Sequence, residues 1–70
     1  MILVFKTSVK DGNDISKLSP FLDKLLSASK WNFDLADCDN ILRINTEKEV
    51  SVVIVKLLQN KGFSCEELPD

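Results

Sequence analysis

Two neighbouring segments in the middle of the chain constrain the fold more than any other feature. Residues 31–35 and 40–45 each alternate apolar and polar side chains with a period of two, the pattern of a half-buried strand. The turn-forming residues 37–40 separate them. A turn of that length pairs Leu35 with Leu42, Phe33 with Ile44, and Asp34 with Arg43. The sequence therefore predicts a β-hairpin in this register.

A helical pattern precedes the hairpin. Apolar residues recur at the spacing of one helical face, at Ile15, Leu18, Leu22, Leu25 and Leu26. Asp14 is a suitable N-cap, but Pro20 would then lie beyond the first turn and remove a backbone hydrogen bond. A start nearer Ser16 or Ser19 avoids that loss. The sequence predicts a helix here and leaves its first residue open.

A second helical pattern follows the hairpin. Residues 46–49 read TEKE, the form of a capping box in which Thr46 and Glu49 each accept from a backbone N–H at a helix start. Gly62 is a suitable stop. Between them lies an apolar stripe at Val50, Val53, Ile54, Leu57 and Leu58. The β-branched run 52–55 is compatible with a strand, but the cap, the stripe and the glycine favour a helix.

Short apolar segments at residues 2–5 and 63–68 predict the first and last strands, which makes the order βαββαβ. Right-handed crossovers and one apolar face per element favour two helices on one face of a four-stranded antiparallel sheet in the order 4-1-3-2. The predicted fold class is α+β, a ferredoxin-like βαββαβ sandwich. We expect a single domain over residues 1–70.

Charge and composition argue against several classes of function. Nine basic and eleven acidic residues are scattered along the chain, so the basic footprint of a nucleic-acid-binding protein is missing. Phe5 is the one aromatic residue on the two central strands, and we expect it to face the helices. The opening apolar run is too short for a signal peptide or a membrane span. We therefore expect no nucleic-acid or membrane partner and a cytoplasmic location.

The residues that catalysis requires are also missing. The chain contains no histidine, so no serine can be activated in the usual triad. No paired carboxylates fall in an expected pocket. We expect no enzyme activity, no catalytic residue and no cofactor.

Two stretches carry a resemblance to a known family. WNFDLADCDNILRI resembles the second and third strands, and VIVKLLQNKGFSCEEL the second helix and its Gly-aromatic turn, of the heavy-metal-associated (HMA) domain family. That family comprises small ferredoxin-like modules of copper chaperones and metal-transporting ATPases. Its Cys-x-x-Cys metal motif would fall between Thr7 and Leu18, where this chain reads TSVKDGNDISKL. Because this interval lacks Cys, His and Met, the resemblance implies the fold but assigns metal binding to no residue.

The two cysteines do not rebuild such a site. In the expected topology Cys38 and Cys65 lie at opposite edges of the sheet, roughly 14 Å apart at the usual strand spacing. A disulfide requires Cα atoms within about 7 Å. We expect Cys65 to be a small packed residue at or near the core, and both cysteines to remain thiols.

The loops after the first strand, at the hairpin tip and after the second helix should emerge at one end of the fold. Two clusters there offer oxygen ligands and one thiol: Asp11, Asn13 and Asp14, and Asp37, Cys38 and Asp39. Together they could hold a hard cation weakly, although neither follows the calcium-loop spacing. Ordinary turn chemistry explains the same residue types and is the interpretation we favour. A small-ligand or metal-ion binding or transport domain with a divergent site at this end is the alternative function.

The sheet face away from the helices is the other candidate. By alternation it carries an apolar centre, Ile2, Val4 and Ile41, bordered by Asp34 and Arg43 and by Lys6 and Asn32. Val52 and Val55 also point away from the stripe of the second helix. Such groups can be merely solvated, or they can form a contact surface. The main prediction is a non-catalytic interaction module that docks on a protein partner or on a second copy of itself.

Overall fold

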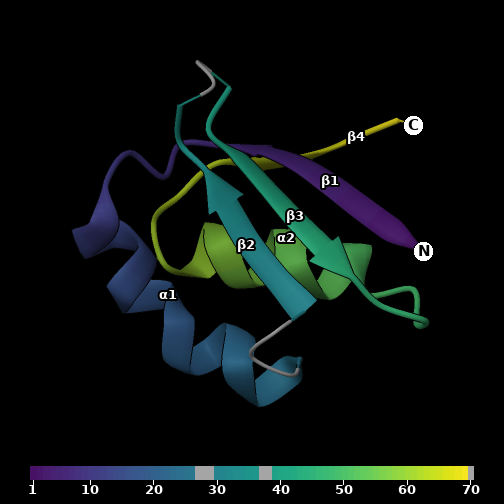
Figure 1. The fold of residues 1–70 in the computed structure, drawn as a ribbon. Helices are drawn as coiled ribbons and strands as arrows, with labels where there is room; N and C mark the ends of the chain where they lie inside the picture. Colours follow the sequence, from purple (N-terminus) through teal and green to yellow (C-terminus); the bar gives the residue numbers. More distant parts are fainter. Residues whose placement is uncertain (27–29, 37–38, 70) are drawn as a thin grey trace.

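The fold is a ferredoxin-like α+β sandwich, as the sequence predicts (Figure 1). The computed structural model describes residues 1–26, 30–36 and 39–69. The elements, in chain order, are β1 (Ile2–Thr7), α1 (Gly12–Leu25), β2 (Trp31–Asp34), β3 (Ile41–Asn45), α2 (Ser51–Asn60) and β4 (Cys65–Leu68). Every strand pairing is antiparallel, and the order β2-β3-β1-β4 is the predicted 4-1-3-2 arrangement.

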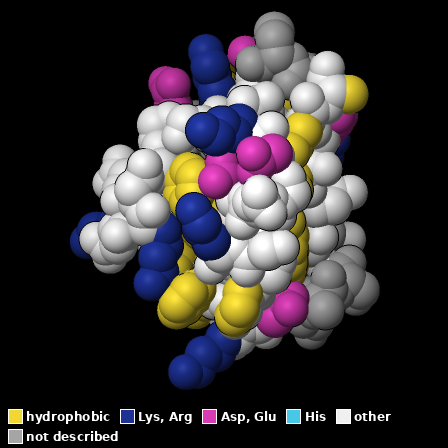
Figure 2. Space-filling view, turned by 90° about the vertical axis from the view of Figure 1, so that its left-hand side faces the viewer, with side chains coloured by type: hydrophobic (Ala, Val, Ile, Leu, Met, Phe, Trp, Pro, Cys, Tyr) yellow, Lys and Arg dark blue, Asp and Glu magenta, His cyan; other side chains and the backbone are white. Residues whose placement is uncertain are grey.

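Both helices lie on one face of the sheet, so the other face is left open (Figure 1). Seen from the side of α1, the surface carries Lys, Arg, Asp and Glu side chains around patches of apolar ones (Figure 2). No helix among the described residues is long and apolar enough to cross a bilayer.

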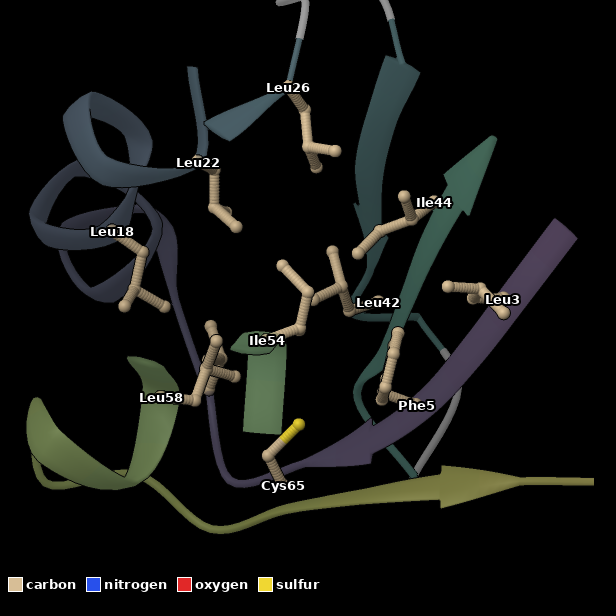
Figure 3. Close-up of a cluster of buried hydrophobic side chains, with 11 residues drawn as sticks. Leu3, Phe5, Leu18, Leu22, Leu26, Leu42, Ile44, Ile54, Leu58 and Cys65 are labelled. Carbon is tan, nitrogen blue, oxygen red and sulfur yellow. The ribbon is translucent and has the colours of Figure 1, made fainter. Parts of the chain in front are cut away.

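The hydrophobic core lies between the helices and the sheet. In Figure 3, Leu18 and Leu22 of α1 and Ile54 and Leu58 of α2 point toward the side chains of β1 and β3. The residues of this cluster are Leu3, Phe5, Val9, Leu18, Leu22, Leu26, Leu42, Ile44, Ile54, Leu58 and Cys65. Phe5 is fully buried, as expected, and therefore offers no ring for stacking on a base. The predicted packing of Cys65 at the core is also confirmed.

The hairpin exists, but its predicted register is wrong by two residues. Phe33 pairs with Leu42, and Asn32, not Asp34, lies opposite Arg43. The connection between β2 and β3 runs over residues 35–40 and is longer than the expected turn. Asn40 ends it in the left-handed region with φ of 50°. A shift of two residues keeps every side chain on its predicted face, which is why the core is unaffected.

Helix α1 begins earlier than the sequence suggested. Asp11 is the N-cap, and its carboxylate accepts a hydrogen bond of 3.0 Å from the Asp14 N–H. The candidate starts at Asp14, Ser16 and Ser19 are therefore wrong. Pro20 lies inside the helix on its exposed side, where solvent can replace the missing N–H donor.

Helix α2 begins later, because the predicted capping box does not form. Thr46 accepts from the Lys48 N–H at 3.1 Å, and Glu49 accepts from the Ser51 N–H at 2.9 Å, so both side chains close local turns. The helix starts at Ser51, and its buried face is Ser51, Ile54 and Leu58. Val53, placed in the inner stripe by the sequence, is 48% exposed.

The end of α2 agrees with expectation. Gly62 has φ of 91°, a conformation that favours glycine, and the following Phe63 N–H donates to the Leu58 carbonyl at 2.9 Å. Strand β4 then begins at Cys65 rather than at Phe63.

Candidate functional site

The loop that follows β1 is held by hydrogen bonds to the β2–β3 connection. Thr7 donates its backbone N–H to the Asp39 carbonyl at 3.3 Å and its hydroxyl to the Asn40 carbonyl at 2.7 Å. The same hydroxyl oxygen accepts from the Val9 N–H at 3.2 Å. The polar groups of Thr7 therefore bond other parts of the protein rather than a ligand.

The same loop is also held to the segment before β4. Ser8 donates its N–H to the Ser64 carbonyl at 3.2 Å, and its Oγ accepts from the Ser64 N–H at 2.9 Å. The three connections thus meet at one end of the molecule, as the sequence predicted (Figure 1).

The first predicted ligand cluster forms the start of α1. Asp14 is buried, and its carboxylate accepts from the Lys10 N–H at 3.1 Å, while Asp11 accepts from Asp14. These two side chains satisfy backbone donors at a helix N-terminus, where their charge also complements the helix dipole. Asn13 is exposed. The cluster is therefore organised as a helix cap.

The second cluster is described only in part. Asp39 forms an ion pair with Lys6, with 3.7 Å between Oδ1 and Nζ. Asp37 and Cys38 lie outside the described residues. Within residues 1–26, 30–36 and 39–69, no group of three or more His, Cys, Asp or Glu side chains could hold a metal ion.

The open face of the sheet carries a smaller exposed apolar centre than the sequence indicated. Ile2 is 49% exposed and Val4 is half-buried, and Leu68 of β4 lies beside Val4 in the sheet register. Ile41, the third predicted member, is only 5% exposed and contributes little accessible surface. The exposed apolar centre is therefore Ile2, Val4 and Leu68, and we call these three residues the apolar patch.

The burial of Ile41 follows from its neighbours on the sheet. On the open face it lies directly between Lys6 of β1 and Asp34 of β2. A lysine at such a cross-strand position covers its neighbour with its long methylene stem. The ion pair from Lys6 to Asp39 holds that stem in place. Ile41 consequently stabilises the sheet rather than offering a contact.

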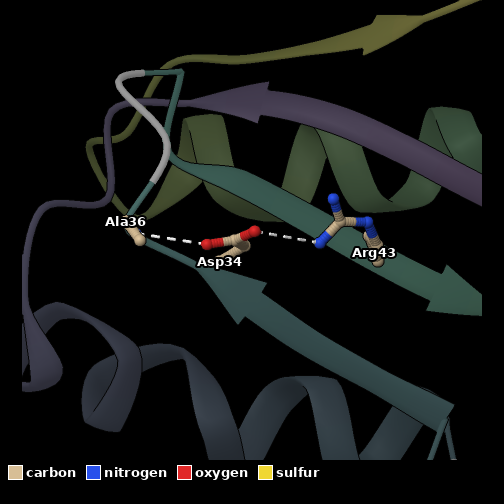
Figure 4. A network of polar contacts seen from close by, with 3 residues as sticks. All are labelled: Asp34, Ala36 and Arg43. Atoms are coloured by element: carbon tan, nitrogen blue, oxygen red, sulfur yellow. Dashed lines mark hydrogen bonds and ion pairs between the residues drawn. The ribbon is translucent and has the colours of Figure 1, made fainter.

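Beside the apolar patch, Asp34 and Arg43 form a polar network on the open face (Figure 4). Arg43 Nη1 lies 3.4 Å from Asp34 Oδ2, although the two residues are diagonal rather than opposite. The other carboxylate oxygen of Asp34 accepts from the Ala36 N–H at 3.2 Å. Both side chains are partly exposed, so the pair contributes little to stability. Its effect is to orient the two charges that border the face.

A shallow hollow lies between Ile2 and Arg43. Its volume is about 220 Å³, and it is lined by Ile2, Lys30, Trp31, Asn32, Arg43, Ile44 and Asn45. Trp31 lines this hollow, but its indole N–H is already used, because Nε1–H donates to Asp23 of α1 at 2.9 Å. The open face therefore combines an apolar patch, a depression beside it and a charged border.

The helix side carries exposed apolar residues that alternation did not identify. Phe21 and Leu25 of α1 and Val53 of α2 are exposed, so the placement of Leu25 on the inward face of the first helix is wrong. Lys61 Nζ lies 3.8 Å from the centre of the Phe21 ring. The only sequence signal for Phe21 was its position beside the apolar stripe of α1. Val52 is 66% exposed, as predicted, whereas Val55 is partly buried against the core.

The thiol of Cys65 is buried and is not activated by its surroundings. Burial raises the pKa of its thiol to about 11, because the charged thiolate would lose its hydration. It lies in β4 opposite Thr7 and packs in the core. A nucleophilic role for this thiol therefore has no support in its surroundings.

Comparisons with protein-family models, with curated proteins and with solved structures find no significant match.

Proposed function

We propose that this protein is a non-catalytic interaction module, an HMA-like domain without the family's metal motif. Its docking surface is the apolar patch Ile2, Val4 and Leu68 together with the bordering pair Asp34 and Arg43. The occupant is a protein surface, supplied by a partner or by a second copy of the chain. A cytoplasmic setting, in which both cysteines remain thiols, is part of this proposal.

The observation that carries the proposal is the exposure of apolar side chains on a sheet face that no described helix covers. Val4 and Leu68 are cross-strand neighbours, and Ile2 continues the same face along β1. An apolar centre with a polar, charged border is the usual anatomy of a protein–protein contact. The hollow beside Ile2 adds a depression into which a partner side chain can pack.

The end of the fold at which the three connections meet supports the same proposal, because its polar side chains already form hydrogen bonds within the protein. In the HMA family this end holds the metal-binding cysteines, whereas here Thr7, Ser8, Asp11 and Asp14 bond the backbone of their own loops. A divergent ion or small-ligand site there stays a prediction, and no contact of the described residues favours it. Amide shifts around Asp11 and Asp39 on titration with Zn²⁺ or Ca²⁺ would revive it.

The experiment compares three baits in an extract of the cells that make the protein. They are the wild-type chain, Val4→Lys on the open face, and Val53→Lys on α2 as a control with the same change of side chain and charge. We expect partners, or untagged copies of the chain, to be retained by the wild type and by Val53→Lys and lost from Val4→Lys. Ile2→Lys serves as a second open-face variant, because Ile2 is more exposed and tolerates the change better.

Equal retention by all the baits would contradict the proposal. Amide spectra of the core residues establish that each variant is folded, so that a loss of binding reports the surface and not the fold.

A further inference from the structure

Strand β4 forms one outer edge of the sheet. It pairs with β1 on one side, and no described strand lies on its other side. The outward backbone N–H and C=O groups of an edge strand are free to pair with another extended chain. Of the two edges in this sheet, β4 is the one with charged side chains that remain available.

Those charges are acidic and project on both sides of the strand. Glu66 lies opposite Lys6 on the open face, and Glu67 lies opposite Phe5 on the helix side. Both are exposed, and neither forms an ion pair with a described residue. On the other edge, β2 offers only Asp34, which is already paired with Arg43. The acidic side chains of the β4 edge are therefore not engaged in an ion pair with any described residue.

A hollow runs along the helix side of β4. It has a volume of about 260 Å³ and is lined by Ser51, Val52, Val55, Lys56, Gln59 and Glu67. The two valines give it an apolar wall next to the acidic edge. A second hollow, of about 480 Å³, continues past Glu67 to Glu49 and Pro69. An extended chain laid along β4 would place alternate side chains in this space.

We propose that the β4 edge accepts an extended, basic segment of a partner protein as a fifth strand. Alternate apolar side chains of that segment enter the hollow walled by Val52 and Val55. Its lysine or arginine side chains alternate with the apolar ones and therefore lie on the open face, against Glu66. The inference deepens the proposed function, on which it rests, by adding the edge to the open face as a contact and by stating the partner's chemistry.

A second copy of the chain fits this edge poorly. Antiparallel pairing of two β4 strands would bring two Glu66-Glu67 pairs together, and like charges on paired strands are destabilising. The same repulsion protects the edge from aggregation. A basic strand removes the repulsion and replaces it with attraction, which selects a partner different from the chain itself.

The test is a titration of the labelled protein with the peptide acetyl-KVKVKVK-amide, followed by amide chemical shifts. We expect shifts at Cys65 to Leu68 and at Val52 and Val55, with a Kd on the order of 0.1–1 mM because so short an edge buries little area. The acidic counterpart acetyl-EVEVEVE-amide should give none. Glu66→Lys should weaken binding by about fivefold or more, whereas Glu47→Lys, with the same charge change away from the edge, should not.

The inference would be overturned by no shifts with the basic peptide, by equal shifts with the acidic one, or by shifts confined to Ile2, Val4 and Arg43. Shifts of the β4 amides on dilution of the protein alone would assign the edge to a second copy and would also overturn it. Val4→Lys separates the two proposals. If this variant still binds the peptide but loses partner capture, both stand; if the baits differ but no peptide binds, only the edge inference fails.

Discussion

The Thr7 hydroxyl donates a hydrogen bond of 2.7 Å to the Asn40 carbonyl, joining the end of β1 to the residue before β3. Thr7 is 6% exposed, and its hydroxyl also accepts from the Val9 N–H. One oxygen thus satisfies two backbone groups that little water can reach. This contact holds together the end of the molecule at which the loops after β1 and before β3 meet.

Replacing Thr7 with valine removes that oxygen and keeps the shape of the side chain. The Asn40 carbonyl and the Val9 N–H would then lose a hydrogen-bond partner where little water can replace it. We therefore expect the free energy of unfolding to fall by about 1–3 kcal/mol. Urea unfolding followed by Trp31 fluorescence measures it. Thr46→Val is the matched control, since the Thr46 hydroxyl bonds an exposed N–H. Equal effects of the two variants would show that the Thr7 contacts add nothing.

Asp11 provides a test of whether the first cluster is a helix cap or an ion site. Asp11→Ala should lower the free energy of unfolding by about 1 kcal/mol, because the Asp14 N–H loses its acceptor. Asp11→Asn should keep most of the stability that Asp11→Ala loses, since asparagine caps as well as aspartate does. Both results should be the same with and without millimolar Ca²⁺. A loss that appears only with the cation present would identify a ligand rather than a cap.

The start of α2 should depend on pH through Glu49. The Ser51 side chain, and then the bond from its backbone N–H, lower the pKa of the Glu49 carboxyl from its usual 4.5. A lowered folded-state pKa stabilises the fold above the unfolded pKa, and the contribution is lost as the pH falls through the lowered value. Glu49→Gln should therefore reduce Tm at pH 7 and have a smaller effect in acid. Glu47→Gln is the control, and an effect of Glu49→Gln that is independent of pH would contradict the assignment.

The Cys65 thiol should be alkylated slowly in the folded protein. Its raised pKa should also lower the free energy of unfolding at alkaline pH. In a Cys38→Ser background, its alkylation near pH 8 should be about a hundredfold slower than in urea, since the pKa rises from 9.0 to about 11. A raised folded-state pKa stabilises the fold below pH 9.0 and ceases to do so as the pH approaches 11. Cys65→Ala should abolish this component of the alkaline loss. Alkylation at the same rate with and without urea would show that the thiol is accessible.

The order of elements and the inward faces were predictable because they depend only on periodicity. Phe33 and Leu42 face the core in either register of the hairpin, since a slip of two residues preserves the alternation. The register itself depends on the length of the connection, which is set by contacts such as the bond from Thr7 to Asn40. Those contacts link residues far apart in sequence and leave no local signal.

The predictions of the first residues of the helices were wrong for a different reason. Thr46 and Glu49 have the right types and spacing for a capping box, but each bonds the backbone two residues ahead of it. Such local turns compete with capping and use the same side chains. The consequence is that α2 starts later than predicted, at Ser51.

The open face was identified correctly as a face, but its exposed composition was not. Alternation places Ile41 on it, whereas only the structure shows that Lys6 and Asp34 flank it and that it is buried. Leu68 belongs to the same face through its pairing with Val4, a relation set by the register of β4. Accessibility depends on neighbours across strands, and for that reason sequence spacing does not supply it.

Photo-cross-linking from the open face tests the central claim most directly. A benzophenone amino acid is placed at Ile2, and in a matched protein at Val53, and both are irradiated in the cells that make the chain. We predict a defined cross-linked product, a dimer or a partner adduct, from position 2 that is absent from position 53 and disappears when Val4→Lys is added. No product from position 2, or the same product from both positions regardless of Val4→Lys, would contradict docking through the open face.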